Sequence, residues 1–228
     1  MKFTTSLLPA ITAFACTATA FLSSASAADL LYHISLNTAP LMTSTAAPFY
    51  LDFQLNDGAG TGNGNNSALL TGFNFGGGAA TGPTFGTGGF SGSLASTVKL
   101  TDTSAFNEFY QKFTAGSMLA FNVILSTNLN ASAIPDLFSF AILDSSLANI
   151  PTFSPGLSDS LLIVNIDSSP TVETYAANGS IAPSAGGAGI ALAAPSFTAV
   201  PEASTYGLIA SASLLALVVF RRRRLAAR

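Results

Sequence analysis

Apolar and polar residues alternate along several short segments of this chain. In residues 49–56 every odd position is Phe or Leu, and the even positions are Tyr, Asp, Gln and Asn. Residues 30–37 and 119–125 repeat this period of two, and residues 94–100 repeat it more weakly. A period of two is typical of a strand that buries one face. We therefore predict four half-buried strands.

Two further segments, residues 137–143 and 161–166, are almost continuously apolar and are bounded by Pro or Asp. Such runs are typical of strands that are covered on both faces. The Gly-rich stretch 57–92 is expected to form loops, with a single strand near residues 69–75. Six or more strands predict a mostly β fold, a single jelly-roll-like β-sandwich over residues 28–175.

One segment has a helical period. Its aromatic residues fall at positions i, i+3, i+4 and i+7, namely Phe106, Phe109, Tyr110 and Phe113. The preceding Asp102, Thr103 and Ser104 are candidate helix caps. The spacing predicts one short amphipathic helix that packs its aromatic side into the sandwich.

Residues 176–199 contain no charged residue and are rich in Ala, Gly, Ser and Pro. This composition is typical of a linker, which would span roughly 25 to 30 Å on average. We expect it to separate the domain from the end of the chain.

The end of the chain, residues 200–228, has three parts. An apolar segment, 206–220, is followed by a basic end, 221–228, that begins with Arg221, Arg222, Arg223 and Arg224. As a helix, 15 residues cover about 22 Å of a hydrocarbon core of roughly 30 Å, so the arginines must snorkel to the headgroups. A basic cluster also stays on the cytoplasmic side. The sequence predicts a short transmembrane helix with its C-terminus inside the cell.

The other end predicts export. Lys2 precedes a mostly apolar stretch, 7–22, and Ala25 and Ala27 form a small-x-small cleavage site. This is the pattern of a signal peptide, residues 1–27, which the Sec machinery exports and signal peptidase removes. The only cysteine, Cys16, leaves with it. The exported part then has neither a disulfide framework nor a thiol nucleophile.

The polar motif before the apolar segment carries a resemblance. Together with the apolar segment and the basic end, it resembles the PEP-CTERM sorting tail of Gram-negative bacteria that make exopolysaccharide. The matching residues are Val200, Pro201, Glu202, Ser204 and Thr205. The resemblance implies recognition by an exosortase, a membrane-embedded peptidase, and delivery from the inner membrane to the cell surface or extracellular matrix. Ala203 stands where the family has its second proline, so a permanently membrane-anchored protein is the alternative.

The exported region is acidic and sparsely charged. Residues 28–199 contain eight Asp and two Glu against Lys99 and Lys112, a net charge of −8. This balance argues against nucleic acid as a partner, and against anionic polymers unless a divalent cation bridges them.

Few residues point to catalysis, and we expect no enzyme. His33 is the only histidine, it lies on a polar strand position, and no Gly-x-Ser-x-Gly motif is present. One histidine without cysteine also makes a zinc site improbable. The alternative is a glycan hydrolase that uses two carboxylates. Its best candidates are Asp52 and Glu108, which the predicted strand and helix place on solvent-facing positions. A structural or binding protein should contain no acidic pair in a cleft.

Binding chemistry is sparse as well. The loop 57–66 is rich in Gly and Asn but lacks the EF-hand spacing, so we expect no cofactor, and a structural calcium is the alternative left open. The chain has no Trp, and Tyr50 and Tyr175 occupy polar positions where they could contact a sugar. We expect an exported cell-surface or matrix protein, structural or binding, that associates with exopolysaccharide.

Overall fold

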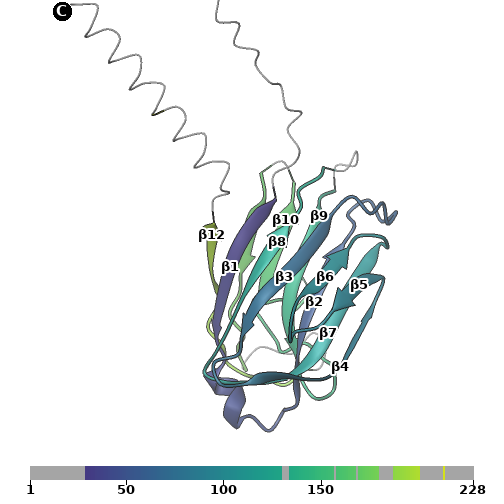
Figure 1. Cartoon of the computed structure of the whole chain (residues 1–228). Coiled ribbons are helices and arrows are strands. Elements are labelled where there is room, and N and C mark those ends of the chain that lie inside the picture. The colour runs from purple at the N-terminus through teal and green to yellow at the C-terminus, as the bar shows by residue number, and fades with distance from the viewer. Residues whose placement is uncertain are drawn as a thin grey trace, which may run out of the picture.

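A computed structural model of the chain describes residues 29–129, 134–156, 158–167, 169–179, 187–200 and 213 (Figure 1). Almost all regular structure in these residues is β. The elements are β1 (Leu30–Asn37), the 3-10 helix η1 (Ala39–Thr43), β2 (Phe49–Asn56), β3 (Ser67–Asn74), β4 (Ala79–Thr87), β5 (Gly89–Gly92), β6 (Val98–Thr101), β7 (Phe106–Thr114), β8 (Met118–Leu125), β9 (Asp136–Leu143), β10 (Leu162–Ile166), β11 (Thr171–Thr174) and β12 (Ser196–Val200).

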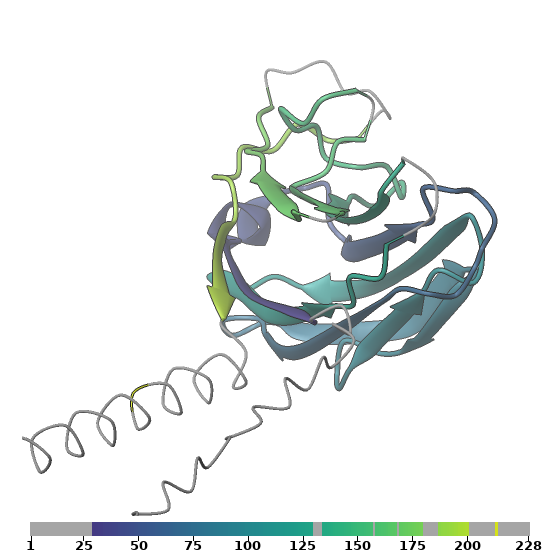
Figure 2. The same cartoon turned by 90° about the horizontal axis from the view of Figure 1, so that it is seen from above.

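The strands form two antiparallel sheets of six strands each. Sheet 1 has the order β12-β1-β8-β3-β6-β5, and sheet 2 has the order β11-β10-β9-β2-β7-β4. Seen from above, the two sheets form separate layers (Figure 2). One apolar cluster contains inward residues of both sheets, so the core lies between the layers.

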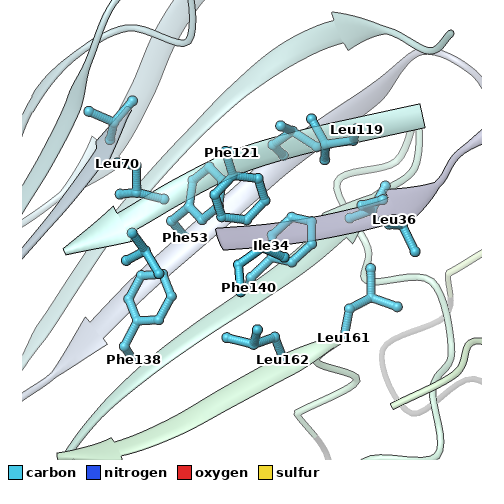
Figure 3. Close-up of a cluster of buried hydrophobic side chains, with 14 of the residues drawn as sticks. Ile34, Leu36, Phe53, Leu70, Leu119, Phe121, Phe138, Phe140, Leu161 and Leu162 are labelled. Carbon is cyan, nitrogen blue, oxygen red and sulfur yellow. The ribbon is translucent and has the colours of Figure 1, made fainter. Parts of the chain in front are cut away.

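The centre of the core is aromatic (Figure 3). Phe53 of sheet 2 is fully buried, and its ring centroid lies 5.2 Å from that of Phe140 in the same sheet and 5.3 Å from that of Phe121 in sheet 1. Ring pairs at these separations attract each other beyond their buried area. The alternation of residues 49–56 therefore points the Phe53 ring into the core, where it contacts rings of both sheets.

Most of the predicted strands are confirmed. The segments 30–37, 49–56, 119–125, 137–143 and 161–166 coincide with β1, β2, β8, β9 and β10 to within one residue, and β9 is buried on both faces. The weak segment 94–100 is a strand only from Val98 onward. Leu94 instead lies in the preceding turn, which the bond from Ser93 N to Thr97 O closes at 2.9 Å.

The predicted helix at residues 106–113 is wrong. This segment is the strand β7, paired with β2 and β4. The misleading period arises because two inward positions are polar. Asn107 and Gln111 are buried, and their side chains bond backbone groups: Asn107 Nδ2 donates to Leu55 O at 2.9 Å, and Gln111 Oε1 accepts from Leu94 N at 2.8 Å.

The Gly-rich stretch 57–92 contains three strands rather than one, β3, β4 and β5. Gly86 of β4 shows why glycine suits this sheet edge. A Cβ at Gly86 would lie 2.0 Å from Glu108 O, so only a residue without a side chain allows the two backbones to approach this closely.

The range predicted to be a linker takes part in the fold where the structure describes it, in residues 176–179 and 187–199. Ala177 and Leu192 are buried and pair with each other, and β12 adds an edge strand to β1. Small uncharged residues suit such packing as well as they suit a linker. Leu31 lies opposite Val200, so both ends of the described domain lie at the same pole (Figure 1).

The predicted signal peptide and most of the predicted sorting tail lie outside the described residues. This applies to Ala25 and Ala27, to Pro201–Thr205 and to Arg221–Arg224, whereas Val200 is the last residue of β12. Among the residues that the structure describes, no helix is both long and apolar enough to cross a membrane.

Candidate functional site

The outer face of sheet 2 gathers most of the domain's polar chemistry. Side chains alternate across a strand, so the inward position of Phe53 turns Asp52 and Gln54 away from the core. The register places Gln54 between Glu108 of β7 and Ser139 of β9. One row of side chains thus crosses the middle of the sheet on this face.

A groove of about 510 Å³ lies over this face, between the sheet and the chain that follows β9. Amide and hydroxyl side chains predominate in its lining, together with one carboxylate. The lining residues are Gln54, Asn56, Leu137, Ser139, Asn149, Pro155, Ser158, Ser160, Ile163, Asn165 and Glu173. Such groups both donate and accept hydrogen bonds, as a polyhydroxylated ligand requires.

The wall of the groove is held by hydrogen bonds within residues 149–160. Asn149 Nδ2 donates to Ser158 O at 2.7 Å, and Thr152 N donates to Asp159 Oδ1 at 3.0 Å. The buried Ser154 hydroxyl lies 3.0 Å from that of Ser158. These bonds give the loop between β9 and β10 a defined shape beside the sheet.

Asp144 fixes the beginning of this wall. Its carboxylate accepts bonds from Ser146 N at 2.8 Å, from the Ser146 hydroxyl, from Ala148 N and from Ala188 N at 2.8 Å. Although burial opposes ionisation, these donors lower the pKa of Asp144. An ionised Asp144 therefore ties two distant segments to the end of β9.

Beside the groove lies a pair of carboxyl groups joined by one amide. Gln54 Nε2 donates to Asp52 Oδ2 at 2.8 Å and to Glu108 Oε1 at 3.4 Å, so these two oxygens are at most about 6 Å apart. Burial, and then the charge of Glu108, raise the pKa of Asp52 to about 8. Burial also raises the pKa of Glu108. At neutral pH, Asp52 is therefore mostly protonated.

The expectation that Asp52 faces solvent is wrong, because its side chain is only 1% exposed. Its Oδ1 is buried and has no hydrogen-bond partner. Glu108 is half-buried. An acidic pair therefore does lie beside a groove, contrary to what we expected of a binding or structural protein, but one of its members is covered.

An aromatic strip, defined as Tyr50, Tyr110 and Phe85, crosses β2, β7 and β4 on the same side. The Tyr50 and Tyr110 rings meet edge to face at 6.1 Å, and the Tyr110 and Phe85 rings stack at 5.4 Å. Phe85 is 44% exposed. Of these three residues, the sequence pattern pointed only to Tyr50. Tyr110 was missed because residues 106–113 were expected to be helical.

The second predicted contact, Tyr175, lies at the opposite edge of sheet 2. Its hydroxyl donates to the Glu173 carboxylate, which belongs to the groove. Burial, and then Glu173, raise the pKa of Tyr175 to about 12. The structure therefore brings Tyr50 and Tyr175 to one sheet, on either side of the groove.

The remaining candidates lie elsewhere. His33 is exposed on sheet 1, where its Nδ1 is 3.0 Å from Asn122 Oδ1. The Asp57 carboxylate of the glycine-rich loop accepts bonds from Ala59 N, Gly62 N and the Thr61 hydroxyl, which lower the pKa of Asp57 although burial opposes this. Asp57 thus organises its own loop. Within the described residues, no group of three or more His, Cys, Asp or Glu side chains could hold a metal.

A second buried acid pair lies near this loop. Asp102 is fully buried, and burial, together with the neighbouring Asp136, raises the pKa of Asp102 to about 6. Asn66 links the pair, because its N–H donates to Asp102 Oδ1 and its Nδ2 donates to Asp136 Oδ2. The sequence predicted Asp102 to be a helix cap. It instead accepts a hydrogen bond from Asn66 N at the end of the loop 57–66.

No protein-family model matches this chain, and neither a curated protein nor a solved structure is significantly similar to it.

Proposed function

We propose that this protein is an exported β-sandwich that binds a neutral polysaccharide of the cell surface or extracellular matrix through the outer face of sheet 2. The observation that carries the proposal is the position of the polar groove next to the aromatic strip. Amides and hydroxyls match sugar hydroxyls, and ring faces match the C–H faces of sugars.

The fold that we propose is a jelly roll. Strands β1, β8, β3 and β6 are neighbours in sheet 1, and β2, β7 and β4 are neighbours in sheet 2. Successive strands therefore cross repeatedly between the layers, as they do when a long hairpin is wrapped into two sheets. In this arrangement one sheet face is free to carry a ligand.

Charge supports a neutral ligand. Residues 28–199 carry a net charge of −8, and Glu173 adds a carboxylate to the groove itself. A uronic-acid polymer would be repelled there, whereas a neutral glycan has no such penalty. The carboxylate can accept bonds from two sugar hydroxyls.

Affinity electrophoresis tests this proposal. The exported protein should be retarded in gels that contain a neutral host polysaccharide and unaffected by a uronic-acid polysaccharide. Tyr110→Ala should weaken retardation about tenfold, since it removes the central ring of the strip. The control is Phe197→Ala on sheet 1, which removes an aromatic ring that is 42% exposed, and should change nothing. Equal losses in both variants would contradict the proposal.

One observation favours a second candidate, a carboxylate-based glycan hydrolase. Asp52 and Glu108 have the separation that two catalytic carboxyls need. The burial of Asp52 makes this the weaker proposal, because a catalytic acid must reach the glycosidic oxygen. If the protein releases reducing ends from the polysaccharide and Glu108→Gln abolishes that release, the hydrolase is the better description.

We further propose that residues 1–27 are a signal peptide and that residues 200–228 are a PEP-CTERM-like tail processed by an exosortase. The position of both domain ends at one pole supports this, since the chain can leave toward the membrane from a single side. Intact mass distinguishes the outcomes. A species spanning residues 28 to about 202 in the medium indicates processing, whereas a species spanning 28–228 only in membranes indicates a permanent anchor.

A further inference from the structure

The short helix η1 lies at the pole opposite the domain ends (Figure 1). Its Leu41 and Met42 line a second cavity. Its volume is about 550 Å³, within the range of small-molecule sites. Apolar side chains form most of its walls, chiefly Leu41, Pro48, Phe49 and Phe113. Met42, which is 59% exposed, stands at the mouth and can adjust to different shapes.

A bulge in β4 borders this cavity. The register with β7 runs from Ala80 opposite Phe113 to Thr84 opposite Gln111, so three residues of β4 face Lys112 alone. Within the bulge, Gly82 O accepts a hydrogen bond from Gln111 Nε2 at 3.0 Å. Bulges re-aim side chains at functional positions, and this one turns Thr81 toward the cavity.

Two polar groups at the cavity have no partner in the described part of the chain. The Thr81 hydroxyl is buried and forms no hydrogen bond. The side chain of Lys112 runs beside Gly82 of the bulge. It forms no ion pair among the described residues. A buried hydroxyl without a partner costs free energy, which an acceptor would recover once rotation of the Thr81 side chain brings the hydroxyl to the cavity.

We propose that this cavity binds a small anionic amphiphile, with a carboxylate head on Lys112 and Thr81 and an alkyl chain against Phe49 and Phe113. Apolar walls with a few convergent polar groups are the usual form of such a site. The charge of the head follows from Lys112, one of only two lysines in residues 28–199. The cavity shares no lining residue with the polysaccharide groove, although Lys112 lies opposite Tyr50 of the aromatic strip.

Calorimetry with decanoate, below the concentration at which it aggregates, tests the proposal on the exported protein. Decanoate should bind, and decan-1-ol, with the same chain and no charge, should bind about tenfold more weakly. Decyltrimethylammonium should not bind, because its charge matches that of Lys112. These three ligands test the site without any change to the protein.

Variants then locate the head group. Lys112→Gln should weaken decanoate about tenfold and leave decan-1-ol unchanged, and Thr81→Val, which keeps the shape, should weaken decanoate about threefold. Lys99→Gln, a change at the other lysine, exposed on β6, is the matched control and should have no effect. Equal binding of decanoate and decan-1-ol, equal losses in the two lysine variants, or no binding of any ligand would overturn the proposal.

Discussion

The two sheets share one core but differ on their outer faces. On sheet 1 the outer positions of neighbouring strands carry groups such as His33, which is exposed, and Asn122, which bonds it at the surface. On sheet 2 the corresponding positions include Asp52, Ser139 and Ala141, all of them buried. The outer face of sheet 2 is therefore covered at these central positions, although Phe85 near its β4 edge stays exposed.

The difference arises from the connections, not from the strands. The long chain between β9 and β10 folds back beside sheet 2, where Asp144 anchors it and where it forms one wall of the groove. Water is thereby partly removed from the amide and hydroxyl side chains that line the groove. Low local solvation strengthens the hydrogen bonds of such groups. Loops thus give one face of a symmetric scaffold its chemistry.

Among variants that test the contrast between the two faces, Asp52→Asn should have the largest effect on the free energy of unfolding. The pKa of Asp52 in the fold, about 8, lies above its ordinary value of 3.8, so folding favours the protonated form. The contribution of this carboxyl to the free energy of unfolding should therefore fall from about pH 4 to about pH 8 and level off above it, by a few kcal/mol and at most about 6. The uncharged variant should lack this contribution, most clearly between about pH 6 and about pH 8, because the raised pKa values of Asp102 and Glu108 make stability fall at lower pH in any case. Urea titrations at several pH values measure the difference.

The matched control for Asp52→Asn is Lys99→Gln on the outer face of sheet 1, which should keep the wild-type pH dependence. If Asp52→Asn unfolds with the same pH profile as the wild type, Asp52 is solvated in solution. The contrast between the two faces would then be lost.

The next largest effect concerns the loop itself. Asp144→Ala removes four hydrogen bonds from a carboxylate that is 5% exposed, and should lower the free energy of unfolding by about 3 kcal/mol. Because the pKa of Asp144 is lowered in the fold, its contribution is complete above pH 3.8 and is lost as pH falls through the folded pKa. Urea unfolding at pH 6 and pH 3 should show the variant's deficit shrinking in acid. An equal deficit at both pH values would mean that Asp144 acts by packing alone.

Local pattern was enough to predict much of the fold. Where inward residues are apolar, as at Leu51 and Phe53, the period of two gave the strand and its buried face. Where an inward position is polar, as at Asn107 and Gln111, the same reasoning gave a helix. Those side chains are buried because they bond backbone groups of distant segments, which no local period contains.

The candidate site was less predictable for a related reason. The outward position of Tyr50 followed from its strand, and the structure agrees. The burial of Asp52 did not follow, because a period of two gives the face on which a side chain lies and not what packs on that face. Glycine composition was also ambiguous, since close strand packing at Gly86 and a mobile loop require the same residue.

A smaller effect on stability should test how strongly the charge of Glu108 acts on Asp52. Glu108→Gln removes the charge that helps to raise the pKa of Asp52. The variant should therefore keep the falling stability curve but reach its plateau below pH 8, with a gain of about 1 kcal/mol at pH 7. Urea titrations measure both quantities. An unchanged plateau would mean that burial alone sets the pKa of Asp52.

The smallest effect is expected on sheet 1. His33→Ala removes one exposed hydrogen bond, to Asn122, and should change the free energy of unfolding by less than about 0.5 kcal/mol. A solvated group gains little from its partner because water replaces the bond. Urea unfolding of the variant and the wild type provides the measurement. A loss above about 1 kcal/mol would show that sheet 1 also carries a structured outer face, and the asymmetry would then lie in residue type and not in solvation.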